Sequence, residues 1–118
     1  MARIDHADSA IGIVRAPINA DFVQGDWDKV IPVGITATGR VVKGAGQTGV
    51  IGVVVPGRTV YRAGQIADIV QKGDIVDCVG LAAGTKYYSD AAGAVSTTST
   101  GTYIGYTVEA DRLVVAGF

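Results

Sequence analysis

The sequence predicts an all-β fold, a small Gly-rich β-barrel or sandwich of about eight short strands with an extended N-terminal arm. The 118 residues include 17 glycines, about twice the average share of roughly 7%. These glycines separate short runs of β-branched and aromatic residues, the pattern of strands joined by tight turns. Hydrophobic residues make up 48% of the chain, which excludes a disordered protein. The length fits one domain, and no segment shows a clear helical period.

Residues 1–29 differ from the rest of the chain. Polar residues come first, followed by a short apolar run at 10–17. Pro17 has no amide hydrogen and forces the preceding residue toward extended geometry, which suits an edge strand or an arm. The segment 1–29 is therefore either an extended arm or the first strand, and residues 30–118 are expected to form the barrel domain.

Two strands are expected at residues 30–36 and 39–43, joined by a hairpin connection at 37–39. Residues 48–55 are almost continuously apolar, so this segment predicts a strand that is covered on both faces. Pro56 follows directly and ends the strand.

The segment 65–71 is ambiguous, because its apolar residues fit both a strand and a helix. A tight turn at 72–74, leading into the apolar run 75–79, favours a pair of strands.

Two further pairs of strands are expected near the C-terminus. Gly93 can take the positive φ of a tight reversal, between a Lys-Tyr-Tyr run and a Val-Ser-Thr-Thr run. The apolar segments 103–108 and 113–116 form the closing pair around a turn at 109–112.

The chain lacks the residues from which catalytic and metal sites are commonly built. His6 is the only histidine and lies in a polar terminal stretch, where a solvated side chain is expected. Cys78 is the only cysteine, so no internal disulfide and no cysteine-based metal site can form. It is expected to be a small buried hydrophobe, with a reactive thiol as the alternative. We therefore expect no enzyme activity, no catalytic residue, no metal site and no cofactor. The acidic residues expected to form turns are Asp68, Asp74, Asp77, Asp90 and Asp111.

Charge and hydropathy also limit the partners. The formal net charge is -1, and no basic run or basic-aromatic pattern is present, so nucleic-acid binding is not expected. The N-terminus lacks the apolar core of a signal peptide, and no stretch is apolar enough to span a membrane. A protein made and kept in a cytoplasm-like compartment is expected.

Four segments carry a resemblance to a known family: 63–65, 72–77, 83–98 and 101–110. Their order and sequence resemble the capsid cement, or head decoration, proteins of tailed bacteriophages. The resemblance implies a homotrimer made in the host cytoplasm that binds the outer surface of the virion capsid. It further implies that the protein holds neighbouring subunits of the major capsid protein together.

Under this resemblance, two groups of residues are candidates for binding. An arm that orders on the shell could add a strand to a sheet edge of the capsid protein, and deletion of residues 1–20 is then expected to leave a folded barrel that no longer binds. The candidate arm residues are Ile11, Ile13, Val14, Pro17, Ile18 and Phe22. The candidate subunit-interface residues are Val50, Ile51, Val53, Val55 and Tyr61.

The alternative is a non-catalytic β-barrel binding module, either a carbohydrate-binding domain or an adaptor. A carbohydrate-binding role predicts that Trp27 and the tyrosines are exposed in one concave patch. A cement role predicts that they are largely buried or lie at protein contacts. The tyrosines concerned are Tyr61, Tyr87, Tyr88, Tyr103 and Tyr106.

Overall fold

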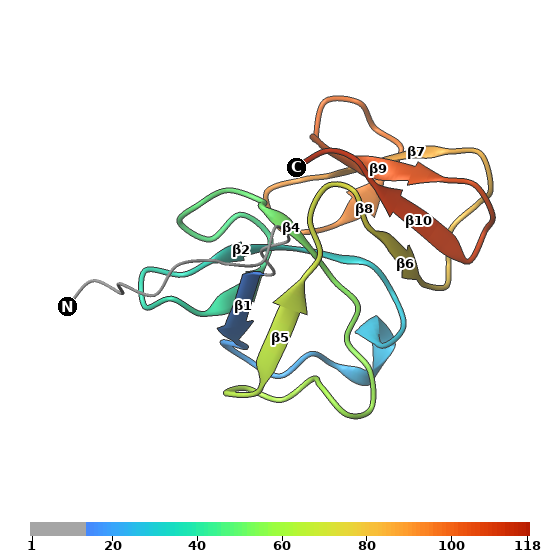
Figure 1. Ribbon diagram of the computed structural model, residues 1–118. Coiled ribbons are helices and arrows are strands. Elements are labelled where there is room, and N and C mark those ends of the chain that lie inside the picture. The colour runs from blue at the N-terminus through green and yellow to red at the C-terminus, as the bar shows by residue number, and fades with distance from the viewer. Residues whose placement is uncertain (1–13) are drawn as a thin grey trace, which may run out of the picture.

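The computed structural model describes residues 14–118, and this part of the chain is all-β, as predicted (Figure 1). It contains ten short strands rather than about eight, arranged in three sheets whose named strands pair antiparallel. One short 3-10 helix, η1 (Gln24–Asp26), is also present. The strands are β1 (Val14–Pro17), β2 (Ile31–Ile35), β3 (Val41–Lys43), β4 (Gly52–Val54), β5 (Ile66–Ile69), β6 (Ile75–Asp77), β7 (Lys86–Ser89), β8 (Val95–Ser96), β9 (Thr102–Thr107) and β10 (Arg112–Val115).

The first five strands close into a small barrel. β2 pairs with both β3 and β4, and β1 pairs with β5. An antiparallel bridge between Val53 and Val70 joins β4 to the end of β5. A parallel bridge between Ile18 and Val41 joins the end of β1 to β3, where the Asn19 amide donates to the Val41 carbonyl at 2.9 Å. These two bridges complete the ring, and closure leaves few unpaired strand edges.

The interior of this barrel is filled by aliphatic side chains and one phenylalanine. Ile18 and Phe22, from the segment after β1, are 1% and 6% exposed. The N-terminal segment therefore supplies both a strand and core side chains to the barrel. The buried cluster consists of Ala16, Ile18, Phe22, Ile31, Val33, Val41, Val54, Ala67 and Ile69.

The last five strands form an open sheet in the order β6-β10-β9-β7-β8, which lies beside the barrel (Figure 1). Both predicted hairpins are present. β7 pairs with β8 across a reversal in which Gly93 has φ 88°. β9 pairs with β10 across a turn closed by the Arg112 amide, which donates to the Glu109 carbonyl at 3.2 Å.

A second core lies between this sheet and the barrel. Val53 belongs to it, whereas the next residue, Val54, belongs to the barrel core. β4 is thus covered on both faces, as predicted, although the strand itself is shorter than the predicted segment 48–55. The second cluster consists of Val30, Val53, Val76, Cys78, Tyr87, Ile104, Leu113 and Val115.

The segment 65–71 contains a strand and not a helix. Along β5, exposed and buried side chains alternate, as they do in a strand with one face on a core. The predicted pairing of this strand with the next was wrong: β5 pairs with β1, and β6 pairs with β10. The turn at 72–74 instead forms backbone hydrogen bonds with the end of β10. The Gly73 amide donates to the Val115 carbonyl at 2.9 Å, and the Val115 amide donates to the Asp74 carbonyl at 2.8 Å.

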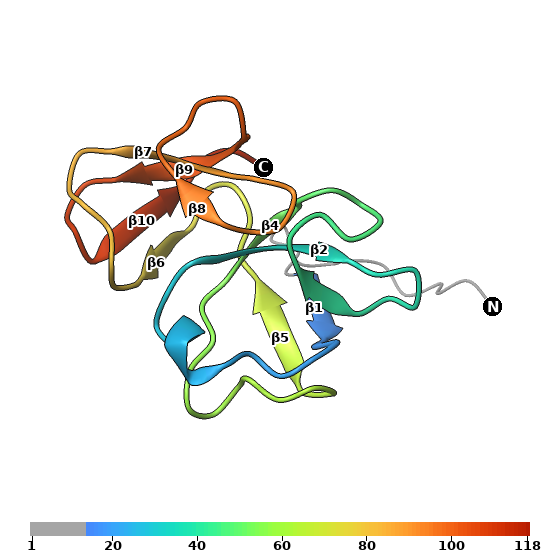
Figure 2. The ribbon, with the colours of Figure 1, turned by 180° about the vertical axis from the view of Figure 1, so that it is seen from behind.

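The β7–β8 loop fastens the sheet to the barrel (Figure 2). The Ala45 amide donates to the Ala91 carbonyl at 3.0 Å. A Cβ on Gly93 would lie 2.7 Å from the Gly44 amide nitrogen, and a Cβ on Gly44 would lie 2.8 Å from the Ala92 carbonyl carbon, so the loop approaches the barrel this closely because both residues are glycines. The two halves therefore share a core and a backbone contact.

Candidate interaction surfaces

The outer face of the five-stranded sheet points away from the second core and exposes apolar side chains. Across the strands, Ile75 pairs with Val114, Val114 with Tyr106, and Tyr106 with Lys86. Ile75 is 60% exposed and Tyr106 is 41% exposed, and nearby Val108 is 62% exposed. Contiguous apolar groups on a sheet face are typical of protein contact sites. We call these five residues, Val108 included, the outer face.

A β-bulge extends the aromatic part of this sheet surface. Tyr87 pairs with Gly105, whereas Tyr88 pairs with Tyr103, so Ile104 is an extra residue in β9. Ile104 is fully buried in the second core. Tyr103 consequently stands beside Tyr88 on the side away from the core, with ring centroids 5.4 Å apart and planes tilted by 49°.

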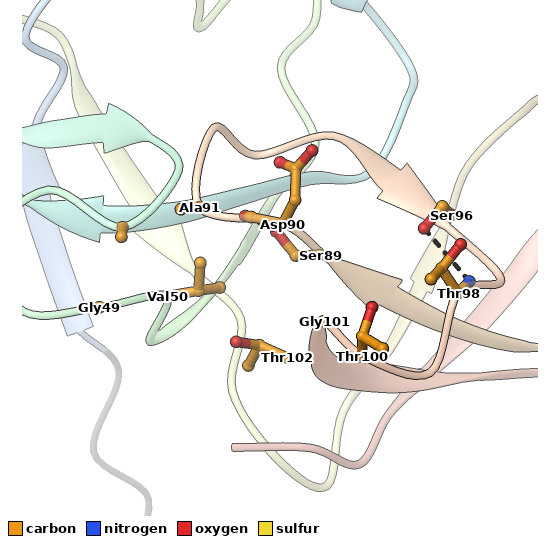
Figure 3. A pocket seen from close by; sticks show the side chains of 11 residues that line it. Gly49, Val50, Ser89, Asp90, Ala91, Ser96, Thr98, Thr100, Gly101 and Thr102 are labelled. Atoms are coloured by element: carbon orange, nitrogen blue, oxygen red, sulfur yellow. Dashed lines mark hydrogen bonds between the residues drawn. The ribbon is translucent and has the colours of Figure 1, made fainter.

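A cleft of about 580 Å³ lies between the barrel and the β7–β9 region (Figure 3). Gly49 and Val50 lie at one end of the view, and Ser96 and Thr98 lie at the other, joined by a hydrogen bond of 3.3 Å. Among the described residues, Asp90 is the only ionisable side chain that lines it. The remaining side chains of the lining are small, and five of them are serine or threonine: Ser89, Ser96, Thr98, Thr100 and Thr102.

The polar groups of this cleft are engaged in local structure. Asp90 Oδ1 accepts hydrogen bonds from the amides of Ala92 and Ala94 at 3.0 and 2.9 Å. Asp90 therefore shapes the β7–β8 turn, as the sequence predicted. The Ser89 hydroxyl donates to the Asp90 carbonyl at 2.8 Å, and the described lining residues include no histidine or lysine. Within residues 14–118, the cleft thus offers hydroxyl groups and one carboxylate that backbone amides already engage.

A second hollow, of about 310 Å³, lies where η1 and the barrel meet the sheet. Its lining includes buried Val30 and Tyr87, half-buried Leu81 and Val95, and the exposed residue Val79. Lys29, Lys43 and Asp26 supply its charged side chains. We call this site, defined by these eight residues, the basic groove.

The candidate arm residues do not lie together on a free surface. Val14 and Pro17 are part of β1, and Ile18 and Phe22 are buried in the barrel. These side chains stabilise the domain in the isolated chain. A deletion of residues 1–20 would remove a barrel strand. Ile11 and Ile13 lie outside the described residues, and so does His6.

The candidate subunit-interface residues are also dispersed. Val53 is fully buried in the second core, and Val55 packs against that core. Ile51 and Tyr61 pack against the barrel core, whereas Val50 lines the hydroxyl-rich cleft. All of these residues except Tyr61 belong to the most continuous apolar run of the chain, and such a run marks burial on both faces. The exposed apolar residues instead lie beside buried apolar residues along β6 and β10, so hydropathy alone does not distinguish the two faces of these strands.

The aromatic side chains are distributed over separate sites. Trp27 packs against Tyr61, with ring centroids 5.0 Å apart, and its indole nitrogen is buried without a hydrogen-bond partner among the described residues. Tyr87 is buried in the second core, where its hydroxyl accepts a hydrogen bond from the Ala82 amide at 2.7 Å. Tyr106 is on the outer face. The single concave aromatic patch expected of a carbohydrate-binding module is absent from residues 14–118.

Cys78 is buried in the second core, and its environment suppresses its reactivity. Burial raises the pKa of its thiol, and the nearby carboxylates of Asp111 and Asp77 raise it further. The thiolate is the reactive form, so the structure favours the buried-hydrophobe interpretation. Between residues 14 and 118, no three His, Cys, Asp or Glu side chains gather as a metal ion would require. No helix in this range has the length and hydropathy to cross a bilayer.

Comparison with solved structures gives a similarity that extends over nearly the whole chain. A solved structure from Mycobacterium phage Patience has the same fold, with a TM-score of 0.73, over 97% of this chain and 95% of that chain. The two sequences are 21% identical. No protein-family model and no curated protein matches the chain. The protein thus shares its fold, over nearly its whole length, with a phage protein.

Proposed function

We propose that the protein is a capsid decoration protein, which binds the outer surface of a phage head and stabilises contacts between major capsid protein subunits. The observation that carries this proposal is the fold shared with a phage protein over nearly the entire chain. The resemblance of segments 72–77, 83–98 and 101–110 to cement proteins agrees with it. The role requires no chemistry and no cofactor.

The architecture suits mechanical reinforcement. The barrel is closed and its core is buried, so it forms a rigid body that keeps its shape when pulled by its neighbours. The outer face leaves Ile75, Tyr106 and Val108 exposed, and burying such residues against another protein would stabilise both partners. We propose that copies associate as homotrimers on the virion surface, after synthesis in the host cytoplasm.

The direct test is to mix the purified protein with undecorated heads of its phage. We expect stoichiometric, saturable binding at local three-fold positions in cryo-electron microscopy, and decorated heads that withstand a higher temperature or denaturant concentration. Heads that remain bare at saturating protein concentration would overturn the proposal. A trimer in sedimentation equilibrium would support the oligomeric part independently.

The arm hypothesis needs a shorter deletion than residues 1–20, because β1 begins at Val14. Removal of residues 1–13 leaves every described strand of the barrel in place. We expect this variant to fold with an unchanged far-UV circular dichroism spectrum and to lose head binding. Unchanged binding would eliminate the arm as a capsid contact.

The alternative, a carbohydrate-binding module, is favoured only by the hydroxyl-rich cleft. Neutral hydroxyls and a carboxylate can recognise a polyol, but stacking aromatics are absent from the cleft lining. A glycan array distinguishes the two functions. Specific glycan binding that is lost on Asp90→Ala, by a protein that ignores heads, would replace the decoration function with this one.

A further inference from the structure

The basic groove combines an apolar interior with a positively charged rim. Val30 and Tyr87 are buried beneath it, and Leu81 and Val95 are half-buried beside it. Val79, at the margin, is 51% exposed. A hollow of about 310 Å³ is at the small end of the range for ligand pockets, and it suits one or two side chains better than an extended cofactor.

The charges around the groove select the kind of side chain that can enter. Two lysines and one aspartate line it. The ammonium group of Lys43 lies 3.7 Å from Asp26 Oδ1, so the single carboxylate already has a cationic neighbour. An acidic group arriving at the rim would be attracted, whereas an additional cation would be repelled.

The groove also joins the two halves of the protein. Asp26, Lys29 and Lys43 belong to the barrel side, whereas Leu81 and Val95 belong to the sheet side. Gly93, which contacts the barrel at Gly44, is part of the same lining. A partner segment seated here would contact both halves at once and would favour their docked arrangement by mass action.

We propose that the basic groove binds an acidic segment of the shell protein, with an aliphatic side chain inserted between Leu81 and Val95. One or more carboxylates of that segment face Lys29 and Lys43. This inference rests on the proposed function, because it names the chemistry of the partner surface. It differs from that function in assigning the principal contact to the groove and not to the outer face.

The test measures the binding of full-length variants to undecorated heads. Lys29→Glu reverses one charge at the rim, and Val79→Glu places a charge beside the apolar interior. The matched controls are Lys72→Glu, at the exposed turn after β5, and Ile66→Glu, on the exposed side of β5 in the barrel. All four substituted residues are exposed, so we expect unchanged circular dichroism and thermal unfolding.

We expect each groove variant to raise the Kd for heads by about tenfold or more, and each control to change it by less than about threefold. The effect of Lys29→Glu should shrink at high salt, because the charges are near the surface. Wild-type protein that does not bind heads would refute the decoration function itself. Wild-type binding with equal loss in all four variants, or loss only in the controls, would refute the groove assignment alone. Conversion of an oligomer to a monomer by Lys29→Glu would identify the groove as a contact between copies and would also overturn it.

Discussion

The barrel and the five-stranded sheet bury the apolar residues of this Gly-rich chain in different ways. The barrel closes on itself through the Ile18–Val41 and Val53–Val70 bridges and buries its own core. The sheet is open and has one face on the barrel. Its opposite face exposes Ile75, Tyr106 and Val108.

This difference assigns stability mainly to the barrel and recognition of partners mainly to the sheet. The barrel uses most of its apolar residues internally, with Val23 and Ile66 as exposed exceptions. The sheet depends on Val30 and Val53 from the barrel region to complete its core, and it leaves apolar residues exposed. We infer that the barrel is the scaffold and that the sheet, together with the groove where it meets the barrel, makes the contacts with other proteins.

The largest expected effects come from substitutions that create a cavity in one core at a time. Leu113→Ala in the second core and Ile18→Ala in the barrel each remove a fully buried side chain, at a cost of about 2–5 kcal/mol. Both variants should unfold in one transition, because Val53 and Val54 couple the cores. Urea titrations followed by Trp27 fluorescence, which reports the barrel side, and by tyrosine circular dichroism, which reports mainly the sheet, should coincide. Separate midpoints would show that the halves are independent units.

The next largest effect on the free energy of unfolding is expected at the glycine contact between the barrel and the sheet. Gly93 has φ 88° and meets Gly44, whereas Gly80 has φ 86° and nothing within 4 Å of an added Cβ. Gly80→Ala should cost about 1–2 kcal/mol from backbone strain alone. Gly93→Ala should cost about 2–4 kcal/mol, because overpacking against Gly44 adds to the same strain. Equal losses in denaturant midpoints would mean that the contact does not fasten the sheet to the barrel.

Asp90→Ala should have a smaller effect, of about 0.5–2 kcal/mol, because it removes the acceptor of the Ala92 and Ala94 amides. The β7–β8 loop should loosen while the barrel stays intact. Amide hydrogen exchange should therefore increase at residues 91–95 and remain unchanged in β1 to β3. Faster exchange throughout the chain would show that the turn supports the whole fold.

The smallest effect depends on pH. Burial raises the pKa of Cys78 in the folded protein above its unfolded value, which is about 8.5. Above that pH the unfolded state binds fewer protons than the folded state, so stability should fall as pH rises through the folded pKa. The Cys78→Ala variant has a lower overall stability, but its unfolding free energy should decline less between pH 8.5 and 10. Parallel pH curves for the two proteins would show that Cys78 does not contribute to this dependence.

Local features were predictable from the sequence because their causes are local. Gly93 lies in a tight reversal because few other residues accept its backbone conformation, and Asp90 caps that turn through amides only two and four residues away. Two apolar segments on either side of the turn at 109–112 marked β9 and β10. The bulge at Ile104, which turns Tyr103 to the side of Tyr88, had no comparable signal, because it arises from the register with β7.

The all-β class, most strand positions and the two C-terminal hairpins follow from the amino-acid sequence alone. The pairing of β5 with β1 rather than β6, the closure of the barrel by Ile18 and the choice of exposed apolar residues depend on the folded chain. Turn geometry and side-chain alternation are properties of neighbouring residues. Pairing between strands far apart in the chain depends on how two cores pack on either side of β4, and that arrangement exists only when the whole chain is folded.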